Sequence, residues 1–77
     1  MVVANFTNIH SKKLGFLAGF VIYKHSNSFS VSIWSAKGFY SSVSFASQSH
    51  AFAFVRFLGV PLKKLNKVIQ NQLSLFN

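Results

Sequence analysis

The side chains that could do acid–base or metal chemistry in this sequence are three histidines, because it contains no aspartate, glutamate or cysteine. Hydrolysis by paired carboxylates, two-metal catalysis and a Ser-His-Asp triad each need a carboxylate, so the composition excludes them. His10, His25 and His50 are far apart in the sequence, which matches no compact metal-binding spacing. We therefore expect no catalytic residue, no metal site and no cofactor.

The charge balance is the strongest chemical signal. The chain has eight lysines and arginines and a formal net charge of +8. Because no side-chain carboxylate can neutralise these cations, the protein projects a positive potential and favours a polyanionic partner. Nucleic acid is the first such partner and an anionic membrane surface is the second.

A membrane-spanning helix is not expected. The longest apolar run, residues 14–23, has ten residues, whereas a span needs about 20. Binding of an amphipathic helix at a membrane surface is a separate alternative, which the serine-rich middle of the chain does not favour. With 77 residues, half of them apolar, the chain is expected to fold as one small domain.

The stretch "KKLGFLAGFVIYK" predicts a helix over residues 12–24, with Ser11 as its N-cap, after an extended segment over residues 1–10. Gly15, Ala18 and Gly19 would share one face of that helix. Glycines inside a helix are costly, so they indicate close packing of a second helix. The alternative is that they fit beneath bulky neighbours in an ordinary core.

A β-hairpin is predicted next, because apolar and polar residues alternate on both sides of the turn "SAKG". Phe29, Val31 and Ile33 would face the core together with Phe39, Val43 and Phe45. The opposite face is expected to contact DNA, or to be only a solvated sheet surface. The predicted DNA-binding residues of this face and its ends are Lys24, Ser30, Ser32, Trp34, Lys37, Tyr40, Ser42, Ser44 and Gln48.

Two helices are predicted to follow. "HAFAFVRFL" is capped by Ser47 or Ser49, ends at Gly59 and buries a stripe of apolar residues, namely Ala51, Phe54, Val55 and Leu58. From Pro61, residues 61–77 predict a basic amphipathic helix with lysines outward, namely Lys63, Lys64 and Lys67. Its inward residues are Leu62, Leu65, Ile69 and Phe76. The predicted fold class is α+β, in the order helix, hairpin, helix, helix.

"LAGF" followed by "SFSVSI" and then "KGFYSSVSFASQ" resembles the LAGLIDADG homing endonucleases over residues 11–60. The resemblance implies that the signature helices of two halves pack through Gly15, Ala18 and Gly19, with the sheet in the DNA groove. In that family an acid at the end of the helix binds Mg²⁺. Here "IYKHSN" places Lys24 and His25 there with no acid, and the second hairpin of a half-domain is missing.

The resemblance thus implies a degenerate, truncated half-domain that binds DNA or RNA, related to homing endonucleases or maturases but without cleavage. It would act as a homodimer or with a complementary half-domain. Such proteins are intron-encoded or free-standing in mitochondrial and chloroplast genomes. The alternative is a small basic structural protein of a ribosome or another ribonucleoprotein, which neutralises RNA phosphates without reading sequence.

Overall fold

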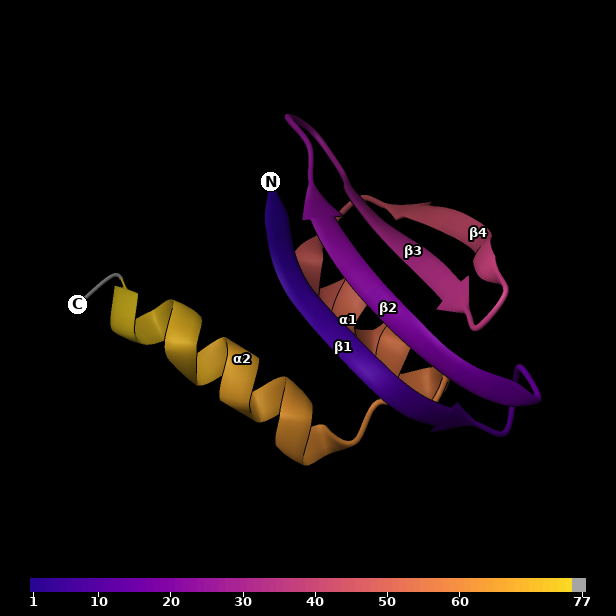
Figure 1. Ribbon diagram of the computed structural model, residues 1–77. Coiled ribbons are helices and arrows are strands. Elements are labelled where there is room, and N and C mark those ends of the chain that lie inside the picture. The colour runs from indigo at the N-terminus through magenta and orange to yellow at the C-terminus, as the bar shows by residue number, and fades with distance from the viewer. Residues whose placement is uncertain (76–77) are drawn as a thin grey trace.

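Four strands precede two helices in the computed structural model, which describes the backbone of residues 1–75 and the side chains of residues 1–68. The elements are β1 (Val2–Ser11), β2 (Phe16–Lys24), β3 (Phe29–Ser35), β4 (Gly38–Phe45), α1 (Gln48–Phe57) and α2 (Leu62–Leu75). Each strand pairs antiparallel with the next, giving the sheet order β1-β2-β3-β4 (Figure 1). The fold is a small α+β fold, but the predicted order of helix, hairpin, helix, helix is wrong.

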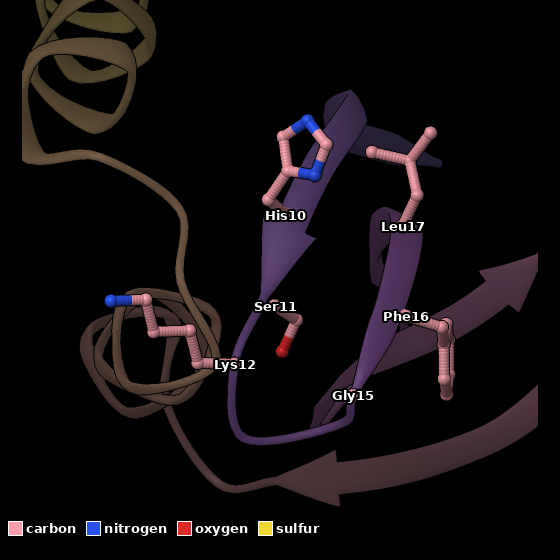
Figure 2. Close-up of a pocket in the computed structure, with 6 residues that line it drawn as sticks. All are labelled: His10, Ser11, Lys12, Gly15, Phe16 and Leu17. Carbon is pink, nitrogen blue, oxygen red and sulfur yellow. The ribbon is translucent and has the colours of Figure 1, made fainter.

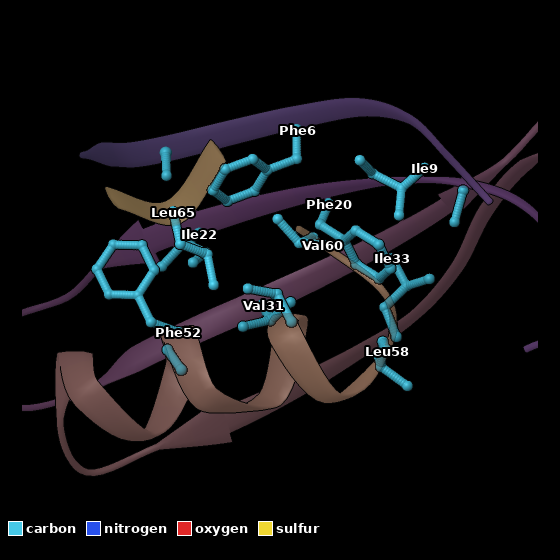
Figure 3. Close-up of a cluster of buried hydrophobic side chains, with 14 residues drawn as sticks. Phe6, Ile9, Phe20, Ile22, Val31, Ile33, Phe52, Leu58, Val60 and Leu65 are labelled. Atoms are coloured by element: carbon cyan, nitrogen blue, oxygen red, sulfur yellow. The ribbon is translucent and has the colours of Figure 1, made fainter. Parts of the chain in front are cut away.

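Helix α1 covers one face of the sheet, which we call the inner face (Figures 1 and 3). Successive side chains of a strand point to opposite faces, so every second strand residue points toward α1. Phe20, Ile22 and Val31 have no exposed surface, and Ala51 and Val55 of α1 are buried with them. Burial of each large apolar side chain stabilises the fold by about 1.5–3 kcal/mol. The other buried apolar residues are Ala4, Phe6, Ile9, Ala18, Ile33, Phe52, Leu58, Val60 and Leu65.

The helix predicted over residues 12–24 is wrong, because residues 12–15 form a turn and Phe16–Lys24 is strand β2. Gly15 has a φ of +82°, and its N–H donates to the Ser11 carbonyl oxygen at 2.8 Å. The Ser11 hydroxyl, predicted to cap a helix, accepts a hydrogen bond from the Leu14 N–H at 3.1 Å instead. Glycine takes this left-handed conformation without a steric cost, which allows the chain to reverse into β2.

Strand β2 resembles a helix in sequence because both of its faces carry apolar residues. Its inner face carries Phe20 and Ile22, while Val21 and Tyr23 on the outer face are half-buried. A strand with apolar residues on both faces has no strict alternation of apolar and polar residues. Such a run cannot be told from a buried helix by periodicity alone. The predicted extended segment, residues 1–10, pairs with β2 as strand β1.

The alternation predicted for β3 is confirmed. Val31 and Ile33 are buried on the inner face, and Phe29 packs against the same core. Ser30 and Ser32 point to the outer face, where both are half-buried. The turn predicted at "SAKG" also connects β3 to β4.

A β-bulge breaks the alternation in β4. Ile33 pairs with Ser41 and Trp34 pairs with Phe39, which leaves Tyr40 as an extra residue on β4. The prediction that Phe39 faces the core is therefore wrong, because Phe39 is exposed and its ring contacts Trp34. An inserted residue reverses the face of everything on one side of the bulge, and sequence alternation alone does not locate it.

Helix α1 is confirmed, and the structure decides which serine caps it. Ser47 has an extended backbone and its hydroxyl accepts from the His50 N–H at 3.3 Å. Gly59, with a φ of +124°, follows the C-cap. A Cβ on Gly59 would lie 3.2 Å from the His10 carbonyl oxygen. Gly59 therefore allows the end of α1 to approach β1 closely.

The predicted core stripe of α1 is mostly correct. Ala51, Val55 and Leu58 are buried. Phe54 is only partly buried, with its ring centroid 5.1 Å from that of Phe45. Phe52, which was not predicted to be buried, joins the core.

Helix α2 begins next to α1 and leads away from the sheet on the side of β1 (Figure 1). Leu65 is buried, whereas Leu62, predicted to point inward, is exposed. The predicted outward lysines are exposed, namely Lys63, Lys64 and Lys67. Ile69 and Phe76 lie outside the described side chains.

Two glycine substitutions test the turn and the strand. Gly15→Ala is expected to lower the free energy of unfolding by about 1 kcal/mol, because alanine would have to adopt a left-handed conformation. Gly19→Ala is expected to leave stability unchanged or raise it by up to about 1 kcal/mol, by restricting the unfolded chain. Its Cβ would lie 3.5 Å from the Phe6 carbonyl oxygen, an ordinary contact. Urea unfolding followed by circular dichroism measures both. A loss of stability for Gly19→Ala as large as that for Gly15→Ala would contradict the placement of Gly19 in strand β2.

The cap of α1 can be tested in the same way. Ser47→Ala is expected to lower stability by about 1 kcal/mol, because the His50 N–H loses its acceptor. Ser49→Ala is the matched control: it removes only a 3.1 Å contact with the Ser47 hydroxyl and should change stability by less than about 0.5 kcal/mol. Equal losses for the two variants would count against Ser47 as the N-cap.

Candidate nucleic-acid interface

Four serines occupy the outer face of the sheet, on the side away from α1. Ser32 lies opposite Ser42, and Ser30 lies opposite Ser44. Ser42 and Ser44 are exposed, and Nε2 of His25 lies 2.8 Å from Oγ of Ser30. Because a hydroxyl both donates and accepts hydrogen bonds, this surface can contact bases or phosphates without carrying charge itself.

The cations of the sheet lie at its two ends. Lys24 and His25 lie at the connection between β2 and β3. Lys12 and Lys13 lie in the β1–β2 turn, and Lys37 lies in the β3–β4 turn, at the opposite end. We call this opposite end, with the turns at residues 12–15 and 36–37, the double-turn end. Strand β3 separates the two ends by about 20 Å.

Exposed aromatic rings gather at the double-turn end. The ring centroids of Trp34 and Phe39 are 5.4 Å apart, with the rings at 68° to each other. Phe16 and Tyr40 form a second edge-to-face pair, at 5.1 Å and 64°. Trp34, Phe39 and Tyr40 nevertheless remain 41%, 58% and 56% exposed. The rings are therefore held by neighbours while offering surface to a ligand.

Three of the surface hollows in the described part of the chain meet at Leu17. The first lies at the β1–β2 turn, where Figure 2 shows His10 and Leu17 on neighbouring strands and Lys12 pointing away from Phe16. The second hollow joins Leu17 to Trp34 on the outer face. The third is lined by Leu17, Lys37 and Tyr40. Trp34, Tyr40 and Lys37 thus border hollows that share Leu17, and Phe39 lies against Trp34.

The structure brings together five of the nine predicted DNA-binding residues on one face. These are Ser30, Ser32, Trp34, Ser42 and Ser44. Lys24 and Lys37 lie at opposite ends of that face. The bulge directs Tyr40 to Phe16, away from the serines.

Gln48 does not lie on the hairpin, because it is the first residue of α1. It lines a hollow between the two helices together with Phe52 and Leu65. The helical face predicted to carry an interface is absent. Gly15 lies in a turn, Ala18 on the inner face of β2 and Gly19 on the outer face.

Two residues of this surface were missed by sequence reasoning. Leu17 was assigned to a helix, and Phe39 was assigned to the core. Correct pairing of β2 with β3 would have placed Leu17 on the face of Gly19 and Trp34. No signal in the sequence located the bulge that exposes Phe39.

The histidines lie on separate elements, with His10 on β1, His25 after β2 and His50 in α1. Nδ1 of His50 lies 2.8 Å from Oγ of Ser47, beside the helix cap. Among the described residues, no group of three potential ligands could hold a metal ion. Lys13 is directed toward α1, with Nζ 4.4 Å from the ring centroid of Phe57.

No helix in the described part of the chain is long and apolar enough to cross a membrane. Comparison with protein-family models, curated proteins and solved structures gave no match.

Proposed function

We propose that this protein binds nucleic acid and does not cut it. The observation that carries the proposal is the charge of +8 with no aspartate or glutamate in the sequence. Within a folded protein, lysines are commonly offset by neighbouring carboxylates, but here a ligand must supply the negative groups. A phosphate backbone supplies them at a regular spacing and releases condensed counterions when it is bound.

The positions of the cations support an extended ligand. Lysines lie at both ends of the sheet, and Lys63, Lys64 and Lys67 are exposed on α2. The serine face between Lys24 and Lys37 is uncharged and offers hydrogen bonds. Over the length of β3, about 20 Å, a nucleic-acid strand presents about six phosphates. A strand lying along the outer face would have cations near both ends and hydroxyls between them.

The absence of cleavage is inferred from chemistry. No side chain in the sequence supplies a carboxylate to bind Mg²⁺ or to activate water. The relation to LAGLIDADG homing endonucleases or maturases remains part of the proposal, as does an origin in a mitochondrion or chloroplast. The predicted fold of a partial LAGLIDADG-like half-domain is wrong, because Leu17–Phe20, the stretch matched to the signature helix, lies in strand β2. The proposed binding therefore rests on charge and surface chemistry and not on a signature helix.

A second candidate function is a structural protein of a ribosome or another ribonucleoprotein. It is favoured by the spread of cations over both ends of the sheet and α2, which suits contact with several RNA segments. This function needs no discrimination between sequences. One round of selection from randomised duplex DNA separates the candidates. An enriched motif that the Ser32→Ala and Ser42→Ala variants bind less tightly favours sequence reading by the sheet. No enriched motif favours the structural role.

The proposed function predicts a steep dependence of affinity on salt. If about four phosphates are contacted, raising salt from about 50 to about 200 mM should weaken binding about a hundredfold. Fluorescence anisotropy with a labelled duplex and a labelled single strand measures this slope. Replacing Lys63, Lys64 and Lys67 by Gln should reduce the slope by about one for each phosphate that the protein no longer neutralises.

Ser→Ala changes at Ser42 and Ser44 serve as controls, because they remove no charge and should leave the salt slope unchanged. Affinity that does not depend on salt, or no binding to either nucleic acid at low salt, would contradict the proposed function.

A further inference from the structure

The double-turn end exposes an unusual amount of apolar surface. Leu17, Trp34, Phe39 and Tyr40 are four of the eight exposed large hydrophobic residues in the described chain. Three of them are aromatic. Trp34 and Tyr40 line hollows that share Leu17, and the Phe39 ring contacts that of Trp34. Single exposed apolar residues are normal, but a contiguous exposed patch marks an interaction site.

The bulge in β4 creates this arrangement. Because Tyr40 is the extra residue, Phe39 turns outward beside Trp34, and Tyr40 meets Phe16. Edge-to-face contacts hold each pair, so little side-chain freedom is lost when a ligand binds. Without the bulge, Phe39 would share the inner parity of Val43. β-Bulges commonly redirect side chains next to binding sites in this way.

Charge selects the class of ligand. A second copy of the chain would bring another +8 charge to the patch with no carboxylate side chain to offset it, so self-association there is opposed. Lys37 borders the same hollow as Tyr40. Flat apolar rings beside a lysine, in a chain without acids, suit a ligand that combines flat rings with phosphates.

We infer that the double-turn end binds single-stranded nucleic acid, with unpaired bases stacked on Trp34, Phe39 and Tyr40 and a phosphate near Lys37. This inference rests on the proposed function and narrows its ligand from nucleic acid in general to single strands. In a duplex, each base pair already stacks on its neighbours, so the flat faces of the bases are covered. Unpaired bases expose these faces, and stacking on aromatic side chains tolerates any sequence.

Trp34 is the only tryptophan in the chain, so its fluorescence reports directly on this site. The full chain is titrated at low salt with oligothymidylate and oligouridylate of about 12 nucleotides, and with a duplex of equal length. Both single strands are expected to quench Trp34 emission and to bind more tightly than the duplex. Quenching by only one of them identifies DNA or RNA as the preferred single strand.

Substitutions that keep apolar bulk but remove a ring test the stacking. Phe39→Leu and Tyr40→Leu should each weaken single-strand binding by about five- to a hundredfold, because each stacked base contributes about 1–3 kcal/mol. Duplex binding should change little. Phe57→Leu is the control for loss of an exposed ring on α1; because that ring contacts Lys13, the readout is the preference for single strands over the duplex, which should not change. Circular dichroism confirms that each variant folds.

The outcomes separate the two proposals. Tight, salt-dependent binding with no quenching, no preference for single strands and no effect of Phe39→Leu or Tyr40→Leu overturns the stacking inference and leaves the proposed function intact. No binding to any nucleic acid overturns both. If instead anionic phosphatidylserine vesicles alone change Trp34 emission, the patch is a membrane contact and the inference fails.

Discussion

The packing of α1 against the inner face of the sheet is the interaction on which the other features depend. Ala51 and Val55 of α1 are fully buried together with Phe20, Ile22 and Val31 of the two central strands. Figure 3 shows Phe20, Ile22 and Val31 pointing into the space between the helix and the sheet. In so small a protein this single apolar layer supplies most of the stabilising free energy. It also decides which residues are left on the outer face, since the side chains of a strand alternate.

Two connections between elements contain a glycine that allows the chain to pack around that core. Gly15 reverses the chain between β1 and β2, and Gly59 lets the end of α1 approach His10. Each glycine occupies a left-handed conformation, where a side chain would be strained. Sequence reasoning anticipated Gly59 as the end of a helix but assigned Gly15 to a helix interior. The difference lies in context: Pro61 follows Gly59, whereas apolar residues surround Gly15 and conceal the turn.

Charge and burial divide the molecule into regions with different chemistry. The layer between α1 and the sheet contains almost only apolar side chains, with Ser11 the buried polar residue among those described. The lysines lie at the ends of the sheet and on α2, Arg56 lies on α1, and the serines of the outer face lie between the two ends of the sheet. Because no acid neutralises the cations, their repulsion opposes the compact state until an anion binds. A polyanionic ligand would therefore add stability as well as use the outer surface.

By itself, the sequence determined the chemical inventory, the alternation of β3, the presence of α1 and the exposure of the lysines on α2. These features follow from composition and from local patterns such as a serine, Ser47 or Ser49, before a helix and Gly59 after it. Only the tertiary structure decided that "LAGFVIYK" is a central strand, because apolar residues on both its buried inner face and its half-buried outer face remove the polar–apolar alternation that identifies strands. The tertiary structure also placed Phe39 and Tyr40, since a bulge depends on the register between two strands and not on either strand alone.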